Sequence, residues 1–347
     1  MEKVTIYDIA KLSGTNITAV SRAFREDTKI SQKKRDLILK VAEEHGYRPN
    51  PVAGSLSRKS ISIGVVYFYS VPDYCDEQVE AIRKKAAELA DFKVSTEILC
   101  CKNEDQIREA FDYFLEKKVQ GVLTNALPES DFVRPAIDEL ERNGIRVALF
   151  NADLPESDRT LCVSVNLKSA ARAAADLLRL FGAGREVAVF AGGKGYTHNI
   201  LTQSFCERAA SFHMKVSGVY FTQDDPEKAA ALAKEVLSSR PRLSGIYISS
   251  ANSIPVLKEL VMAGKAHKIR VVASDVFPGL ASFLREGTVD ATIYQSPALQ
   301  AESALEYLYR AVLSGVKEKK QHYVLPEIVV AGNLGLYEKR NPDEILA

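Results

Sequence analysis

The sequence is poor in the residues that build metal sites, disulfide frameworks and membrane spans. It has five histidines and five cysteines among 347 residues, and no two cysteines have C-x-x-C spacing. This argues against zinc motifs and a disulfide framework, and it favours free thiols in a reducing compartment. No run of about 18 apolar residues occurs, and no apolar segment follows Met1. We therefore expect no membrane span, no signal peptide and a cytoplasmic location.

Sequence signatures of catalysis are absent as well. Neither H-E-x-x-H nor G-x-S-x-G occurs. The glycine cluster Gly192–Gly195 follows an apolar run and faintly resembles a phosphate-binding loop, but it lacks the G-x-x-x-x-G-K-[ST] spacing. We therefore expect no enzymatic activity and no cofactor.

Charge is distributed unevenly along the chain. Residues 1–60 hold 12 Lys and Arg against 7 Asp and Glu, whereas the whole chain holds 46 against 45. A small basic module joined to a mildly acidic body favours a nucleic-acid partner for the module, although a solvated basic face would give the same count. With 46% hydrophobic residues, the chain is long enough for two or three globular domains.

The basic module has the pattern of three short helices. Thr5–Asp8 forms a capping box at the start of the first, and Gly14 interrupts the pattern after it. Asn16 is placed to cap a second helix, Ser31 to cap a third, and Gly46 to end the third. Two short helices about a glycine turn, followed by another helix, predict a helix-turn-helix.

The second predicted helix carries side chains that suit DNA. Arg22 offers a forked donor for guanine, Thr18 and Ser21 offer hydroxyls for phosphate, and Ile17 offers an apolar contact for a thymine methyl group. A three-helix module that binds protein rather than DNA would share this pattern, so both interpretations stay open at this point.

A dense set of residues in this region matches a known family. The set is Val4–Ala10, Gly14, Ala19–Arg22, Ser31, Arg35 and His45–Asn50. In these residues the chain resembles the lactose/galactose repressor family, which implies a DNA-binding regulator of transcription, most often a repressor. From the helix pattern and the resemblance, we predict that the DNA-contacting residues are Thr5, Tyr7, Asn16, Ile17, Thr18, Ser21, Arg22, Asn50, Ala53 and Leu56.

The segment that follows the basic module reads as a conditional helix. Asn50 and Pro51 can start a helix, while Gly54 and two serines weaken it. The resemblance implies a hinge helix that pairs with its dimer mate in the minor groove, where Leu56 wedges between base pairs. A flexible linker with Leu56 packed against the body is the alternative.

Short apolar runs alternate with amphipathic helices from residue 61 onward. The predicted strands are 63–68, 94–99, 121–125, 145–150, 187–191, 216–221, 245–249, 269–273 and 289–294, and the first helices are near 76–90, 104–117 and 129–142. This βαβ rhythm predicts parallel sheets with helices on both faces, in two successive sets that form two lobes with a cleft between them.

The body also carries a resemblance, looser than that of the basic module. Its clearest marks are Ser274-Asp275, Gly287–Ala291 and Gln295–Pro297. They resemble the periplasmic sugar-binding-protein-like effector domain, which implies a doubly wound, two-lobed α/β body that the chain crosses near residues 160, 293 and 323. The predicted fold is this body preceded by an all-α helix-turn-helix head.

The predicted domain limits follow from these patterns. We expect a helix-turn-helix domain over 1–48, a hinge over 49–60, an effector-binding and dimerisation domain over 61–340, and a tail over 341–347. Paired hinge helices and a pseudo-palindromic operator need two copies of the chain. The segment after Tyr337 is too short and polar for a tetramerising helix, so we expect a homodimer.

Ligands of open parallel sheets contact the loops at the carboxyl ends of the strands. That rule nominates Tyr69, Ser70, Asp73, Asn125, Asn151, Asp153, Gly193, His198, Asn199, Ser250, Asn252, Asp275 and Gln295. We predict effector contacts by Tyr69, Asp73, Asn125, His198, Asn199, Asn252, Asp275 and Gln295. Asp275 is selected by the family pattern as well.

The nominated residues also indicate a class of ligand. Amides, carboxylates and an aromatic ring suit a polyhydroxylated molecule, because each hydroxyl can donate and accept. Many relatives have an arginine in the 198–203 region, whereas this chain has His198, Leu201 and Gln203 there. A neutral sugar or polyol is therefore favoured over a sugar phosphate. The effector's identity, the operator sequence and the direction of the response stay open.

Overall fold

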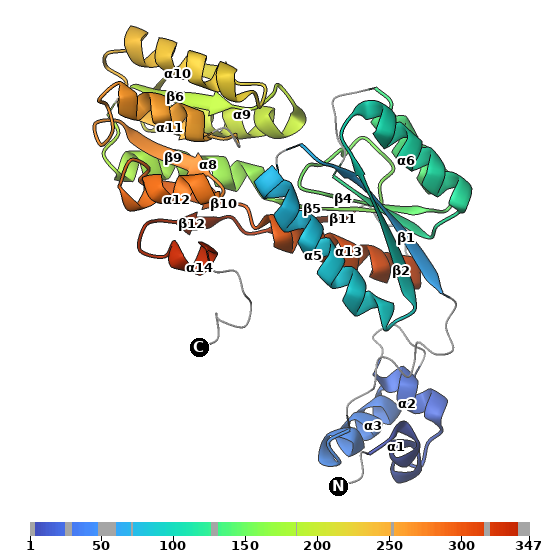
Figure 1. The fold of residues 1–347 in the computed structure, drawn as a ribbon. Coiled ribbons are helices and arrows are strands. Elements are labelled where there is room, and N and C mark those ends of the chain that lie inside the picture. Colours follow the sequence, from blue (N-terminus) through green and yellow to red (C-terminus); the bar gives the residue numbers. More distant parts are fainter. Residues whose placement is uncertain are drawn as a thin grey trace. The chain divides into compact units, whose positions relative to one another are not determined.

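The computed structural model describes residues 4–24, 30–47, 60–70, 72–125, 131–184, 186–250, 253–315 and 320–338. The chain divides into two compact units, a head that ends at Ser60 and a body that holds nearly all of the rest (Figure 1). Within the described ranges, no helix has the length and apolar character that crossing a membrane requires.

The head is a three-helix domain. Its helices are α1 (Ile6–Leu12), α2 (Ile17–Ala23) and α3 (Gln32–Glu44). One face of each helix is buried in a common core that consists of Ile9, Ala10, Ala19, Val20, Ala23, Ile38 and Ala42. The three predicted helices are therefore confirmed.

The ends of the head helices explain their short lengths. The Asp8 carboxylate accepts the backbone N–H of Thr5 at 2.8 Å, and the Asn16 side chain accepts an N–H of the first turn of α2 at 2.8 Å. Gly14 and Gly46 follow α1 and α3 with φ of +59° and +61°. At each glycine the next N–H turns back to a helix carbonyl at 2.8 Å, so the chain leaves the helix there.

The first lobe of the body is built on a six-stranded parallel sheet in the order β2-β1-β3-β4-β5-β11. Its strands are β1 (Ile61–Phe68), β2 (Val94–Cys101), β3 (Gly121–Thr124), β4 (Arg146–Phe150), β5 (Leu161–Val165) and β11 (Lys320–Val324). Its helices are α5 (Pro72–Ala90), α6 (Glu104–Lys117), α7 (Val133–Arg142) and α13 (Pro297–Ser314).

The second lobe repeats this strand order as β7-β6-β8-β9-β10-β12, with β12 alone antiparallel to its neighbour. Its strands are β6 (Glu186–Ala191), β7 (Lys215–Phe221), β8 (Gly245–Ile248), β9 (Arg270–Ser274), β10 (Ala291–Tyr294) and β12 (Glu327–Val329). Its helices are α8 (Leu167–Leu180), α9 (Tyr196–Ser211), α10 (Pro226–Ser239), α11 (Ser253–Met262), α12 (Pro278–Arg285) and α14 (Gly335–Glu338).

Both faces of the second sheet are buried. Along β6, Ala188 and Phe190 join one apolar core with α10, α11 and α12, while Val187 and Val189 join another with α8 and α9 (Figure 1). Alternate side chains point to opposite faces, so a strand covered on both sides is apolar at every position. That is why the sequence shows these strands as continuous apolar runs.

The chain crosses between the lobes three times. It passes from β5 to α8 at residue 166, returns between β10 and α13, and crosses again between β11 and β12. The crossings predicted near 160, 293 and 323 are thus confirmed to within a few residues. The strands β5, β11 and β12, which border these crossings, were missed by the predicted strand set.

Candidate functional site

The exposed face of α2 is the candidate DNA-reading surface. Ile17 is 40% exposed, and Thr18 and Arg22 are exposed too, whereas the other side of the helix is buried in the head core. On the neighbouring α1, Tyr7 is 69% exposed. A short helix with a fork donor, hydroxyl and aliphatic group on one open face has the chemistry that base edges require.

Other predicted DNA contacts have local structural roles. The Thr5 hydroxyl donates to Asp8 at 2.6 Å, and this bond, with the one from the Thr5 N–H, holds the pKa of Asp8 below its ordinary value. The Asn16 side chain caps α2, and Ser21 is half-buried. The predicted hinge contacts Asn50, Ala53 and Leu56 lie outside the described residues.

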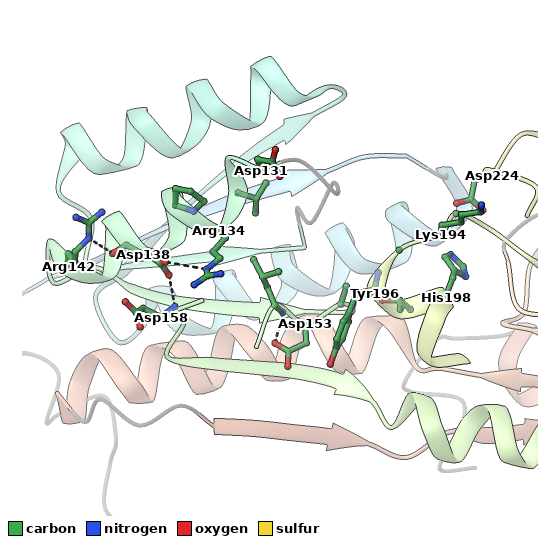
Figure 2. Close-up of a pocket in the computed structure, with 18 residues that line it drawn as sticks. Asp131, Arg134, Asp138, Arg142, Asp153, Asp158, Lys194, Tyr196, His198 and Asp224 are labelled. Carbon is green, nitrogen blue, oxygen red and sulfur yellow. Dashed lines mark hydrogen bonds and ion pairs between the residues drawn. The ribbon is translucent and has the colours of Figure 1, made fainter. Parts of the chain in front are cut away.

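A cavity of about 1270 Å³ opens between the two lobes of the body. Figure 2 shows its wall, which comes from α7 and the loop after β4 in the first lobe, and from the loops after β6 and β7 and the start of α9 in the second. Its lining residues are Asp131, Val133, Arg134, Pro135, Asp138, Arg142, Asn151, Ala152, Asp153, Leu154, Asp158, Gly193, Lys194, Gly195, Tyr196, Thr197, His198 and Asp224. We call this cavity the cleft.

Charges on the first-lobe wall largely satisfy one another (Figure 2). The Asp138 carboxylate lies 3.8 Å from Arg134 and accepts the N–H of Asp158 at 2.6 Å. Asp153 accepts two hydrogen bonds from the buried guanidinium of Arg159, at 2.5 and 2.7 Å. The arrangement leaves a wall rich in carboxylate oxygens whose positions are fixed, and such oxygens are strong acceptors for ligand hydroxyls.

In the second-lobe wall, two polar side chains meet above Gly192. A Cβ atom at Gly192 would lie 2.5 Å from His198 Nε2 and 2.7 Å from an Asp224 carboxylate oxygen, so these two side chains converge above this position. Beside them, Lys194 and Tyr196 also line the cleft, and the tyrosine ring is 46% exposed. An imidazole, a carboxylate, an amine and an aromatic ring together suit a polyhydroxylated ligand.

Replacing Gly192 by alanine should therefore lower the affinity of the cleft for its ligand without unfolding the body. The new methyl group displaces the ends of two side chains rather than backbone, so we expect about a tenfold loss of effector affinity with little loss of stability. Gly332→Ala is the matched control, since nothing lies within 4 Å of its Cβ position and it does not line the cleft. Calorimetric titration should separate the two variants, and equal affinities would contradict the role given to His198 and Asp224.

Among the predicted effector contacts whose side chains the structure describes, His198 lies in the cleft wall. The neighbouring Asn199 donates to a backbone carbonyl at 3.1 Å. Tyr69 donates to a carboxylate of α5 at 2.8 Å. Asn125 brackets the backbone of Phe68, accepting its N–H at 2.8 Å and donating to its carbonyl at 3.1 Å. These three residues hold local structure.

Asp275 and Gln295 are paired with each other. The Gln295 backbone N–H donates to one carboxylate oxygen of Asp275 at 2.9 Å, and the side-chain amide donates to the other at 2.6 Å. Asp275 is buried and is not part of the cleft wall. Asn252 and the side chain of Asp73 lie outside the described residues.

The rule that ligands contact the ends of strands nominated more cleft residues than the eight predicted effector contacts include. Asn151, Asp153 and Gly193, which that rule nominated, line the cleft. Lys194 and Tyr196 were missed, although they stand within or beside the glycine cluster that the sequence made conspicuous. The α7 side chains were missed because nothing in a helix sequence indicates which of its polar faces borders a distant loop.

Comparison with known families agrees with this architecture. A model of the periplasmic binding protein domain matches residues 63–316, and a model of the bacterial regulatory proteins of the lacI family matches residues 5–50. The chain belongs to the periplasmic binding protein domain family and carries a lacI-family head. The expected fold, a lacI-type head followed by a periplasmic-binding-protein-like body, is thereby confirmed.

The chain also matches curated regulators. It is 29% identical over 180 residues to the HTH-type transcriptional regulator DegA of Bacillus subtilis, covering 51% of this chain and 52% of that protein. It is 28% identical over 210 residues to the ribitol operon repressor of Klebsiella aerogenes, covering 59% and 66%. The chain thus spans between half and two thirds of the length of these relatives, which are named as regulators and not as enzymes.

Solved structures share the fold of the body. GanP, a glucose-galactose binding protein from Geobacillus stearothermophilus, superposes with a TM-score of 0.72 at 20% identity, over 80% of this chain and 99% of that one. A putative LacI transcriptional regulator from Bacteroides fragilis gives 0.68 at 16% identity, over 80% and 100%. At these identities the likeness establishes the two-lobed fold.

Proposed function

We propose that this lacI-family protein is a sequence-specific DNA-binding regulator, a repressor, whose operator affinity is controlled by a small molecule bound in the cleft. One observation carries the proposal. A helix-turn-helix head with Ile17, Thr18 and Arg22 on an open face is joined to a two-lobed body with a polar cleft. A ligand that favours one lobe arrangement changes DNA affinity by its differential affinity for the two states.

The proposed effector is a neutral sugar or polyol. The arginines of the cleft wall lie beside Asp138, Arg134 near its carboxylate and Arg142 on its backbone carbonyl, so the negative charge of Asp138 opposes the binding of a phosphate there. The carboxylates of the cleft wall can accept hydrogen bonds from ligand hydroxyl groups, and the half-exposed ring of Tyr196 can pack against a sugar face. Named relatives agree in class, since one is a ribitol operon repressor and solved structures of this fold hold D-arabinose and myo-inositol.

The proposal is tested by DNA binding with and without candidate effectors. Gel shifts on genomic fragments should give a discrete complex with a small number of fragments, and one sugar or polyol of a panel should change its midpoint. A thermal-shift screen supplies the candidates, because a ligand held by the native state raises its apparent stability. Equal binding to all fragments would contradict the proposal that the protein is a sequence-specific regulator. The proposed cytoplasmic location would then lose its support as well.

We further propose that the protein acts as a homodimer on a pseudo-palindromic operator. One helix-turn-helix contacts one half-site, so a symmetric site requires two heads related by a two-fold axis. Sedimentation velocity at micromolar protein should give a dimer, and the complex with operator DNA should contain two chains. A stable tetramer, or a monomer on the operator, would contradict this assembly.

A further inference from the structure

The cleft is elongated, and its polar side chains form two groups at opposite ends. His198 and Asp224 of the second lobe lie at one end, Asp138 and Arg142 of α7 lie at the other, and Tyr196 lies between them (Figure 2). We call these the His198 end and the α7 end. Pockets for drug-sized ligands have volumes of about 300–1,000 Å³, whereas the cleft has about 1270 Å³. A single sugar ring would therefore occupy only part of it.

One face of α7 borders the cleft along most of the helix. Arg134, Asp138 and Arg142 follow one another at intervals of four residues, and all three line the cleft. Residues four apart lie on the same face of a helix, and a rise of about 1.5 Å per residue spreads these three positions over about 12 Å. The cleft therefore follows the helix for about two turns.

The α7 end offers both donors and acceptors in fixed places. The Asp138 carboxylate is held by the backbone N–H of Asp158 at 2.6 Å, and Arg142 donates to the Asp138 carbonyl at 3.2 Å. Arg134 lies 3.8 Å from the same carboxylate, and its side chain is 56% exposed. The apolar Leu154 lines the cleft as well. Guanidinium groups donate to sugar hydroxyls, a carboxylate accepts from them, and an apolar side chain packs against the C–H face of the ring.

We propose that the α7 end is a second sugar-binding subsite, so that the effector is a neutral glycoside of at least two linked sugar units. One unit lies at the His198 end, and the next lies against Asp138, Arg134 and Arg142. The ring of Tyr196, between the two ends, packs against the sugar near the linkage. The inference rests on the proposed effector cleft and narrows the effector from a sugar or polyol to a disaccharide or longer chain.

The test is calorimetric titration of the full chain with monosaccharides and the disaccharides that contain them. The probes are glucose with maltose and cellobiose, galactose with lactose and melibiose, and xylose with xylobiose. At least one disaccharide should bind about tenfold more tightly than its monosaccharide, because its second unit gains hydrogen bonds to charged groups. The double variant Arg134→Ala, Arg142→Ala should abolish this gain and leave the affinity for the monosaccharide unchanged.

Three further variants keep the test decisive. Arg310→Ala is the matched control, because Arg310 is an exposed arginine four residues after Glu306 on α13 and does not line the cleft, so both affinities should stay unchanged. Gly192→Ala, at the His198 end, should weaken the monosaccharide and the disaccharide alike. Asp138→Asn can still accept the N–H of Asp158, and it tests the α7 end should the double variant fail to fold.

Three outcomes would overturn the second subsite. They are equal affinities for each monosaccharide and its disaccharides, a disaccharide gain that persists in the folded α7 variants, and no binding by any of the sugars. Failure of the proposed function would appear elsewhere, because a protein that binds no operator would not be a regulator even if the titrations gave the expected gain.

Discussion

Replacing Arg159 by methionine should lower the free energy of unfolding of the body by about 3–5 kcal/mol. The Arg159 side chain is 6% exposed and its partner Asp153 is 13% exposed, so the substitution leaves a carboxylate that is largely shielded from water without its cation. Arg159 also donates to Gln321 of β11 at 3.3 Å, so the variant loses a link between the cleft loop and the edge strand. Urea unfolding followed by circular dichroism measures the loss.

The matched control is an ion pair on the surface. Arg208 lies 2.8 Å from Asp176, but the two side chains are 39% and 40% exposed. Water replaces such a pair easily, so Arg208→Met should cost less than about 1 kcal/mol. The double variant Arg159→Met, Asp153→Leu removes both buried charges and should recover much of the stability lost in the single variant. Similar losses in Arg159→Met and Arg208→Met would contradict the buried-pair argument.

Replacing Arg22 by alanine should weaken operator binding by about 1–3 kcal/mol, roughly tenfold to a hundredfold. Arg22 is on the exposed face of α2 and does not belong to the head core, so the head should stay folded. A guanidinium that bonds a guanine edge contributes to the cognate sequence alone, whereas a phosphate contact contributes to every sequence. The measurement is a pair of titrations, one with the operator and one with random DNA of equal length.

The control for Arg22 is another exposed cation of the head. Lys40 is on α3, its side chain is 75% exposed, and it lies 4.0 Å from Glu44. Lys40→Ala should change both titrations slightly and to the same extent, because it removes positive charge without removing a base contact. If Arg22→Ala weakened operator and random DNA equally, base reading by Arg22 would be wrong and only a phosphate role would remain.

Much of the architecture could be predicted from local patterns. The helix expected at 104–117 is α6 over the same residues, and its cap Asn103 accepts the N–H of Gln106 at 3.0 Å. Strands that are buried on both faces appear in the sequence as apolar runs. Glycines that adopt a positive φ follow the first and third helices of the head. Each of these signals comes from residues close together in the sequence, so it is visible without the fold.

Edge strands and the residues that line the cleft could not be predicted from local patterns in the sequence. Strand β11 is a polar segment that becomes a strand because it pairs with β5, which lies far away in the sequence. Asn125 and Asp275 have the chemistry of ligand contacts, yet the folded chain gives them internal partners, the Phe68 backbone and Gln295. A polar residue near a strand end can bind a ligand or a neighbouring segment, and its own sequence context does not distinguish the two.

The sequence by itself determined the helix-turn-helix, the two-lobed α/β body and the end of each sheet at which the lobes meet, because periodicity, caps and strand direction are local properties. The tertiary structure alone decided which polar side chains line the cleft. It tied Asp153 to the buried Arg159, gathered His198 and Asp224 over Gly192, and placed Tyr74 of the first lobe against the second. Those contacts join segments from separate βα units, and only packing selects among the partners that their chemistry allows.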